Sequence, residues 1–309
     1  MKLNRRELIA ASASTGALMG LGLGLGLGTT FAANNNLITR AVPASGENLP
    51  VIGIGTNRWV AGGTAEETAG LRNALRTFNE LGGRVIDTAP AYRTSETVLG
   101  ILIEELDIRD AFFLATKVDR AGTEEGIARM EDSLTKLGTD QLDLMQVHNM
   151  RDADNQLETM FDWKDKGLLR YVGITTSRVD QFAEMERLMN AFPLDFIQVN
   201  YSLGEPQAAE RILPTAIDRK AAVLVNRPFG RGRLFKKVAD VSLPAWAAGF
   251  DCSSWAQYML KYVVAHPAVT CAIPGMTKAK HVEDNMGAGK GRLPDSAQRK
   301  QQEELFASL

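Results

Sequence analysis

The sequence has 309 residues, of which 45% are hydrophobic and 23% are charged, and its formal net charge at pH 7 is −2. This is the composition of an ordinary soluble globular protein, and the length is sufficient for one large buried core. The charge balance gives no sign of a nucleic-acid partner, which would favour a clustered basic surface. Only two cysteines are present, Cys252 and Cys271, so a disulfide framework is not expected.

The first 32 residues are predicted to form a signal peptide rather than part of the fold. Arg5 and Arg6 belong to a basic start, and residues 8–27 carry no charge and are rich in Ala, Gly and Leu. Small residues at Thr30 and Ala32 favour cleavage after Ala32. The arginine pair resembles a twin-arginine export signal. We therefore expect a periplasmic or exported protein that meets an export machinery, with a mature chain over residues 33–309.

The same N-terminal run is expected neither to anchor the protein in a membrane nor to bind a nucleotide. Its repeated glycines keep it only moderately apolar, although its length would allow a membrane span. The Gly-Leu repeats also contain fragments of a dinucleotide-binding fingerprint. No strand is predicted before them and no folded helix after them, so these fragments are accidental.

From residue 50 onward, short apolar runs alternate with longer segments of helical spacing. Seven segments are predicted helices: 66–81, 95–106, 123–137, 156–166, 178–190, 206–219 and 253–264. Eight runs are predicted strands: Val51–Ile54, Arg84–Asp87, Phe112–Lys117, Leu142–His148, Arg170–Thr175, Phe196–Asn200, Ala222–Asn226 and Val269–Ile273. Apolar strands separated by amphipathic helices indicate parallel strands that are buried on both faces. Eight such units predict an α/β protein with a closed (β/α)8 TIM barrel as its single folded domain.

Two further segments are placed relative to this barrel. Residues 37–50 contain Pro43, Gly46 and Pro50 and predict a short hairpin that plugs the barrel bottom. Residues 230–249 follow the seventh strand and predict a loop over the barrel mouth. Trp59 and Trp246 are expected on mouth loops, either in a substrate pocket or as packing residues.

Ionisable side chains stand at the ends of three successive strands. The second strand ends in Asp87, with Tyr92 five residues later, the third ends in Lys117, and the fourth in His148. Active sites of such barrels lie at the carboxyl ends of the strands, so these four side chains are expected in one mouth. Each alone has an ordinary structural explanation, as a helix cap, a packed ring or a solvated cation. Their joint placement indicates a catalytic group.

These residue types suit the reduction of a carbonyl. The reaction needs a proton donor beside the oxygen, and Tyr92 has an unperturbed pKa of about 10, which a neighbouring ammonium would lower. Lys117 must stay charged in a partly buried site, so it needs a carboxylate partner, and Asp87 is placed to be that partner. His148 can hydrogen-bond the substrate oxygen and orient it. A nicotinamide cofactor would carry the hydride.

The chain resembles the aldo-keto reductase superfamily over roughly residues 40 to 290. The motifs that carry the resemblance are Gly53-Ile54-Gly55-Thr56, Asp87-Thr88-Ala89-Pro90-Ala91-Tyr92, Thr116-Lys117, Gln146-Val147-His148, Gln198-Val199-Asn200-Tyr201, Arg227-Pro228-Phe229 and the segment from Ile273 to Asn285. The resemblance implies a (β/α)8 barrel that interconverts aldehydes or ketones and alcohols by hydride transfer. It also implies Tyr92 as the general acid, with Asp87 and Lys117 tuning it and His148 orienting the carbonyl.

The same resemblance implies which residues hold the cofactor. They are Thr56 beside the nicotinamide, Thr175, Thr176 and Gln198 at its carboxamide, Asn226 at its ring, Phe229, Gly230 and Arg231 over the pyrophosphate, and Met276, Thr277, His281 and Asn285 at the adenosine end. NADP(H) is the expected cofactor and NAD(H) the alternative. The expected partner is a small carbonyl or alcohol substrate, and a monomer is expected rather than an oligomer.

Three positions depart from the common family pattern. Thr175-Thr176 stands where Ser-Asn is frequent, so one carboxamide contact differs. Asn226 stands where many members have an aromatic ring that stacks on the nicotinamide. His281, with two lysines nearby, stands where an arginine commonly meets the 2′-phosphate, and a charge-assisted contact can still form there.

Other classes of protein fit the sequence less well. The three histidines and two cysteines lack metal-ligand spacing, so no metal site is expected. Residues 287–290 only imitate a phosphate-binding loop. A non-catalytic redox sensor or partner subunit that binds a nicotinamide cofactor is the main alternative. A glycosidase that pairs Asp87 with Glu96 is weaker, because Glu96 lies within a helix and no second acid ends a strand across the mouth.

Overall fold

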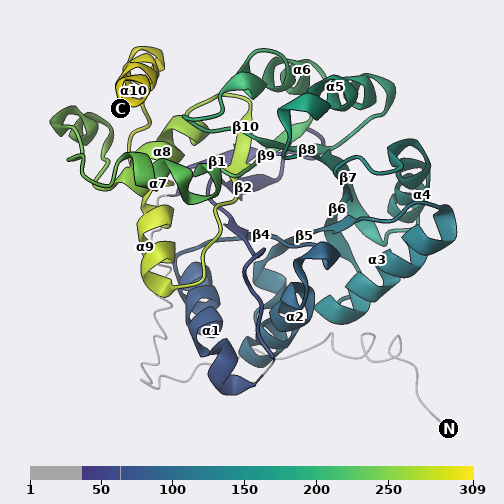
Figure 1. The fold of residues 1–309 in the computed structure, drawn as a ribbon. Helices are drawn as coiled ribbons and strands as arrows, with labels where there is room; N and C mark the ends of the chain where they lie inside the picture. Colours follow the sequence, from purple (N-terminus) through teal and green to yellow (C-terminus); the bar gives the residue numbers. More distant parts are fainter. Residues whose placement is uncertain (1–36, 63) are drawn as a thin grey trace, which may run out of the picture. The chain divides into compact units, whose positions relative to one another are not determined.

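Eight parallel strands follow one another around a single sheet (Figure 1). The computed structural model describes residues 37–62 and 64–309, so the predicted signal peptide, residues 1–32, lies outside the described residues. The order of the strands in the sheet is their order in the chain. The strands are β3 (Ile54–Gly55), β4 (Val85–Asp87), β5 (Phe113–Val118), β6 (Leu142–His148), β7 (Leu169–Thr175), β8 (Phe196–Asn200), β9 (Ala222–Asn226) and β10 (Val269–Ala272).

Backbone hydrogen bonds join the two ends of this sheet and close the barrel. Gly53 N donates to Ala272 O at 2.8 Å, and Ala272 N donates to Val51 O at 2.8 Å. A Cβ atom on Gly53 would lie 2.7 Å from Val85 O, so only glycine allows this close approach. The predicted (β/α)8 barrel is confirmed. The first strand is shorter than the predicted run because residues 51–53 bond to the last strand and only Ile54–Gly55 pair with β4.

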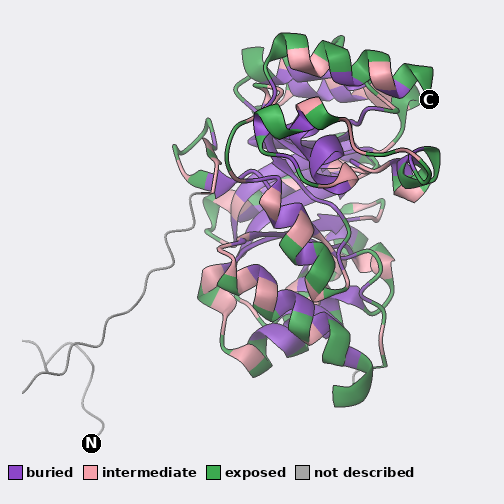
Figure 2. Ribbon diagram, turned by 90° about the vertical axis from the view of Figure 1, so that its left-hand side faces the viewer, coloured by how far each residue is buried: buried purple, intermediate pink, exposed green. Residues whose placement is uncertain are grey.

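Helices surround the barrel, with buried inner faces and exposed outer faces (Figure 2). They are α1 (Ala65–Glu80), α2 (Ser95–Leu106), α3 (Thr123–Leu137), α4 (Ala153–Asp165), α5 (Phe182–Ala191), α6 (Ile212–Asp218), α7 (Arg233–Lys237), α8 (Trp255–Val264), α9 (Ala279–Gly287) and α10 (Ser296–Ser308). All seven predicted helices are present. The helices predicted for 95–106 and 123–137 have the predicted bounds, the other five have shifted ends, and α7, α9 and α10 were not predicted. None of the helices within the described residues is long and apolar enough to cross a membrane.

The barrel interior is apolar near the strand starts and polar near the strand ends. Side chains alternate between the two faces of a strand, so every second residue points inward. One buried cluster inside the barrel includes Val85, Phe113, Leu144, Tyr171 and Phe196. Counting onward from these residues by twos leads to the inward positions at the mouth, which are Asp87, Lys117, His148, Thr175 and Gln198. Strand alternation therefore brings the predicted polar residues to one place.

The hairpin predicted for residues 37–50 closes the bottom of the barrel. Strands β1 (Thr39–Ala41) and β2 (Asn48–Pro50) pair antiparallel. Val42 and Leu49 from this hairpin belong to the interior cluster of the barrel. Glu47 accepts hydrogen bonds from Arg170 at 2.6 Å and from the Tyr171 hydroxyl at 3.0 Å, both on β7. The prediction of a plug is confirmed.

The segment 230–249 differs from the loop that the sequence predicts. It contains the 3-10 turn η5 (Gly230–Gly232), helix α7 and the start of η6 (Ala245–Phe250). Trp255 Nε1 in α8 donates to Val241 O at 2.8 Å, and Lys237 Nζ lies 4.8 Å from the ring centroid of Phe306 in α10. The later part of the segment therefore packs beside α8 and α10, and only its first residues reach the mouth.

Of the two alternatives for Trp59 and Trp246, the structure supports packing. The Trp59 side chain is fully buried, and its indole N–H donates to Met276 O at 2.8 Å. The Trp246 ring packs edge-on against Phe250 and Tyr258, at centroid distances of 5.9 and 5.7 Å. Both rings therefore serve the packing of the protein.

Candidate active site

Asp87 and Lys117 form a buried ion pair in the barrel mouth. Lys117 Nζ donates to the two carboxylate oxygens of Asp87 at 2.8 and 2.7 Å and to Thr88 O at 2.7 Å. These contacts use all three protons of the ammonium group, which offsets much of the cost of burying it. Burial is the largest single influence and lowers the pKa of Lys117, but the charges and hydrogen bonds of Asp87 and Tyr92 together outweigh it and leave the pKa raised. Lys117 is therefore a permanent cation.

Two amide side chains hold the Asp87 carboxylate in place. Gln198 Nε2 on β8 donates to Asp87 Oδ1 at 2.6 Å, and Gln146 Nε2 on β6 donates to the same oxygen at 3.2 Å. Gln146 was not among the predicted site residues. Its position two residues before His148, on the same face of the strand, is the signal that could have identified it.

Tyr92 stands beside this ion pair. It ends the 3-10 turn η1 (Pro90–Tyr92) after β4, and its ring centroid lies 5.2 Å from Lys117 Nζ. Burial raises the pKa of the Tyr92 phenol, and the Lys117 charge lowers it by less, so the pKa lies above its usual value. The predicted effect of Lys117 is present, but the predicted net lowering is wrong because burial is the larger influence. Tyr92 therefore keeps its proton at neutral pH, as a proton donor must.

His148 completes the group at the end of β6. Its ring lies perpendicular to the Tyr92 ring with the centroids 6.1 Å apart. Burial and then the Lys117 charge lower the pKa of His148 to about 4. The imidazole is therefore neutral at physiological pH, with one N–H to donate. It can orient a carbonyl oxygen but holds no extra proton to give.

The residues predicted at the carboxamide form one hydrogen-bonded cluster next to Asp87, and Asn226, predicted at the nicotinamide ring, belongs to the same cluster. Thr175 Oγ1 donates to Gln198 Oε1 at 2.9 Å, and Asn226 Nδ2 donates to Thr176 O at 2.8 Å. Asn226 Oδ1 is buried and has no hydrogen-bond partner within the described residues. A free buried acceptor beside Gln198 suits the NH2 group of a nicotinamide carboxamide, so this cluster fits the predicted cofactor.

Two threonines predicted to contact the cofactor have hydroxyls that already form hydrogen bonds within the protein. Thr56 Oγ1 donates to Asp87 O at 3.1 Å and accepts from Ser95 Oγ at 2.8 Å. Thr176 Oγ1 donates to Gln181 Oε1 at 2.5 Å and accepts from Arg178 N at 3.1 Å. Each threonine shapes the loop after its strand, and only the Thr176 carbonyl joins the carboxamide cluster.

The residues predicted over the pyrophosphate follow β9. Phe229 packs on Phe235 at a centroid distance of 4.8 Å. Gly230 and Arg231 both have positive φ, of 54° and 58°. Arg231 is exposed and makes no ion pair within the described residues. A free guanidinium on a tight turn suits a phosphate group.

The residues predicted at the adenosine end lie in α9 and in the segment just before it. Met276 and Asn285 are buried, Thr277 is half-buried, and His281 is exposed. Lys278 and Lys280, also exposed, lie beside His281 in the first turn of α9. This exposed positive cluster suits the 2′-phosphate of NADP(H).

The arrangement of the described side chains gives little support to a metal site or to a glycosidase. Within the described part of the chain, no group of three or more His, Cys, Asp or Glu side chains could hold a metal ion. Glu96 is buried and accepts a hydrogen bond from Thr116 Oγ1 at 2.6 Å, while Asp87 is bound by Lys117. These two carboxylates do not form the acid pair of a glycosidase.

Comparison with known proteins agrees with the barrel fold and with the arrangement of the site. Residues 51–303 match the Aldo/keto reductase family. Aldo-keto reductase YhdN of Bacillus subtilis is 32% identical over 64% of this chain, and the match spans 62% of its own length, less than two thirds. Methylglyoxal reductase YeaE of Escherichia coli is 30% identical over 77% of this chain and 84% of its own. An aldo/keto reductase from Klebsiella pneumoniae, solved in complex with NADP and acetate, superposes with a TM-score of 0.73 at 27% identity, covering 84% of this chain and 93% of its own.

The chain belongs to the aldo/keto reductase family. It is accordingly an NAD(P)H-dependent oxidoreductase of carbonyl and alcohol groups, as the sequence predicts.

Proposed function

We propose that this chain is an NADP(H)-dependent reductase in which Tyr92 donates the proton, Lys117 and Asp87 support it, and His148 orients the carbonyl. The observation that carries this proposal is the buried Lys117–Asp87 pair, which lies beside the Tyr92 and His148 rings at the strand ends. NADP is bound in the Klebsiella pneumoniae relative, and the exposed cations at the start of α9 suit its additional phosphate.

During the proton transfer only Tyr92 changes its charge, while Lys117, Asp87 and His148 keep theirs. A bound nicotinamide supplies the hydride. The carbonyl oxygen gains negative charge, and Tyr92 Oη gives its proton to that oxygen. Lys117 remains positive beside the phenolate and stabilises it, while Asp87 keeps Lys117 charged and fixed. Neutral His148 donates a hydrogen bond to the same oxygen and holds it near Tyr92.

Turnover of a panel of aldehydes and ketones with NADPH and with NADH tests this proposal. We expect reduction of at least one aldehyde, with the larger kcat/KM for NADPH. The same panel separates the enzyme from the redox-sensor alternative. A chain that binds NADPH tightly but turns over no carbonyl compound, in either direction, is a sensor or partner subunit.

We further propose that the protein is exported with its cofactor already bound. Arg5-Arg6 precedes a charge-free run, and a twin-arginine route carries folded proteins. The nicotinamide site is formed by the folded barrel, so a folded chain can bind NADP(H) before export. The test is to fractionate cells that express the full chain and a variant with Arg5→Lys and Arg6→Lys. We expect the wild type alone in the periplasm with nucleotide bound, and a periplasmic protein free of nucleotide would contradict the proposal.

A further inference from the structure

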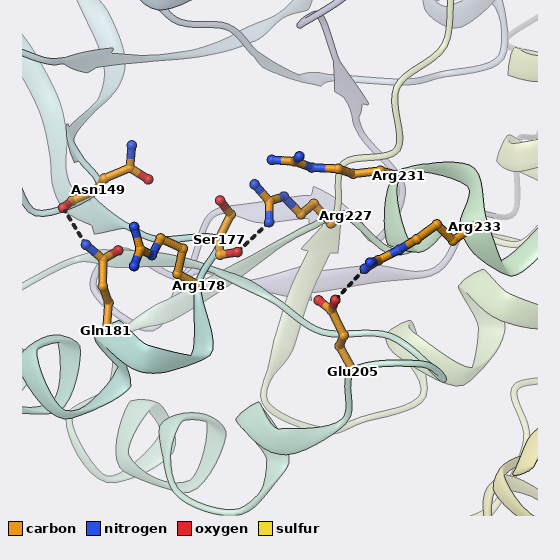
Figure 3. A pocket seen from close by; sticks show the side chains of 8 residues that line it. All are labelled: Asn149, Ser177, Arg178, Gln181, Glu205, Arg227, Arg231 and Arg233. Atoms are coloured by element: carbon orange, nitrogen blue, oxygen red, sulfur yellow. Dashed lines mark hydrogen bonds and ion pairs between the residues drawn. The ribbon is translucent and has the colours of Figure 1, made fainter.

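An arginine-lined cavity lies between loops that follow the strand ends (Figure 3). Its volume is about 760 Å3, and its lining comes from the loops after β6, β7, β8 and β9. Four arginines and one carboxylate line it: Arg178, Arg227, Arg231, Arg233 and Glu205. The cavity therefore carries an excess of positive charge.

Two of these arginines are neutralised within the protein and two are not. Arg178 pairs with Asp180, and Arg233 pairs with Glu205 at 2.7 Å. Arg227 has no carboxylate partner within the described residues, since Nη1 donates only to the Ser177 carbonyl at 2.5 Å. Arg231 makes no ion pair there either. Figure 3 shows the Arg227 and Arg231 side chains pointing into the same space.

The unpaired guanidinium of Arg227 is held at some cost. It is half-buried, and burial followed by the charge of Arg231 lowers its pKa, which shows that the surroundings disfavour the cation. The backbone of Arg227 also adopts the left-handed region, with φ 51°, as does Asn149 across the cavity, with φ 53°. Such conformations are unfavourable in a side-chain-bearing residue and concentrate at functional sites. An anion in this cavity would relieve the repulsion between the two guanidinium groups.

The cavity is close enough to the catalytic group to bind the same molecule. Asn149 directly follows His148, and its side chain lines the cavity. The positive charge of Arg227 also reaches Tyr92, where it helps to lower the pKa of the phenol against the larger effect of burial. An acidic group that binds Arg227 can therefore belong to a molecule whose carbonyl lies at Tyr92.

We propose that Arg227, with Asn149 beside it, binds the acidic group of the substrate, so that the preferred substrates are small carbonyl compounds that carry a carboxylate. This inference rests on the reductase function proposed above. It adds the substrate class. The competing source of an anion is the phosphate of the cofactor, and Arg231 is the residue that the family resemblance places there.

The experiment compares each acid with its own neutral ester. The probes are succinic semialdehyde and para-carboxybenzaldehyde, each with its methyl ester, reduced by the wild type with NADPH. We expect kcat/KM to favour at least one acid over its ester by about 10-fold or more, as a charged hydrogen bond warrants. Turnover of the esters tests the reductase function by itself, so the two proposals can fail separately. Equal kcat/KM for the acids and the esters overturns the inference.

Variants then identify the residue. Arg227→Gln is expected to reduce the acid-to-ester ratio of kcat/KM by about 10-fold or more, and Arg227→Lys to restore part of it. Arg233→Gln is the matched control, since it removes the same charge from the same cavity but from a guanidinium paired with Glu205. The dissociation constant of NADPH is measured for every variant. If Arg227→Gln weakens NADPH binding and reduces acid and ester turnover equally, Arg227 serves the cofactor and the inference is wrong.

Discussion

The two ends of the barrel differ in the interactions that hold them together. At the bottom, the rings of Phe113, Tyr171 and Phe196 pack together in one buried cluster with Val42 and Leu49 of the hairpin, and this end contributes stability. At the mouth, the same inward positions hold ions and amides, and several loop residues have positive φ. Burial of apolar rings stabilises the fold without any need for a charged partner, whereas a buried ion pair stabilises only when every partner is in place. Substitutions at the two ends should therefore affect stability and turnover in different proportions.

The largest combined effect is expected from Lys117→Met at the mouth. This change leaves the Asp87 carboxylate buried without its cation, which costs about 3–5 kcal/mol of stability, and removes the charge that supports Tyr92. We expect kcat to decrease by about 100-fold or more, measured with the variant shown to be folded by circular dichroism. Adding Asp87→Asn should restore part of the stability but none of the turnover. Recovery of both would contradict the assigned roles.

A similar loss of stability without a comparable loss of turnover is expected at the bottom. Phe196→Ala removes a fully buried ring from the interior cluster and should cost about 3–5 kcal/mol, measured by chemical denaturation. Below its unfolding temperature, kcat should remain within a few-fold of the wild type, because the cavity lies away from the strand ends. A large decrease in kcat at full folding would show that the two ends are not independent.

His148 should make the mouth sensitive to acid. Its pKa is lowered to about 4 in the folded state from 6.5, so the unfolded chain binds the proton more readily between these values. The free energy of unfolding should therefore fall by up to about 3 kcal/mol as the pH drops from about 6.5 to about 4. Below that pH, His148 should contribute no further loss. His148→Gln should remove that part of the pH dependence. His266→Gln is the matched control, because burial also lowers the pKa of His266 to about 4 and this residue lies away from the mouth. An unchanged profile for His148→Gln would contradict a buried neutral imidazole.

The smallest effect is expected from the polar edge of the hairpin. Glu47→Gln weakens the contacts with Arg84 and Arg170, which are partly exposed, and should cost about 1 kcal/mol. Because solvent and salt screen these charges, the difference from the wild type should shrink at high ionic strength. The kcat value should not change. A loss of several kcal/mol in the free energy of unfolding that does not depend on salt would contradict this weak, screened contribution of the hairpin.

Much of this contrast could be predicted from the sequence, because strand alternation is a local property. Counting by twos from Val85 or Phe113 leads to Asp87 and Lys117, and the strand order brings them together. Gln146 lay on the same alternation and was still overlooked, because an amide inside a strand gives no signal until its partner, Asp87, is located. The net pKa of Tyr92 depends on how deeply the ring is buried, which no local pattern encodes.

Segments whose shape depends on distant contacts were less predictable. Residues 230–249 form short helices and turns because they pack on α8 and α10, and α10 is itself only weakly amphipathic, with few buried side chains. The hydroxyl of Thr176 could not be assigned to the loop rather than to a cofactor until Gln181 was placed. The arginine cavity also depends on tertiary structure, because Ser177 and Arg227 lie on different strand-end loops.

The most direct test of the central claim is the turnover of Tyr92→Phe. This change removes the phenol oxygen and keeps the ring that packs beside His148. With NADPH binding retained, measured by the dissociation constant, we expect kcat for aldehyde reduction to fall by about 100-fold or more, in line with the loss of a general acid. A Tyr92→Phe protein that binds NADPH normally and reduces the aldehyde within a few-fold of the wild-type rate would contradict the account.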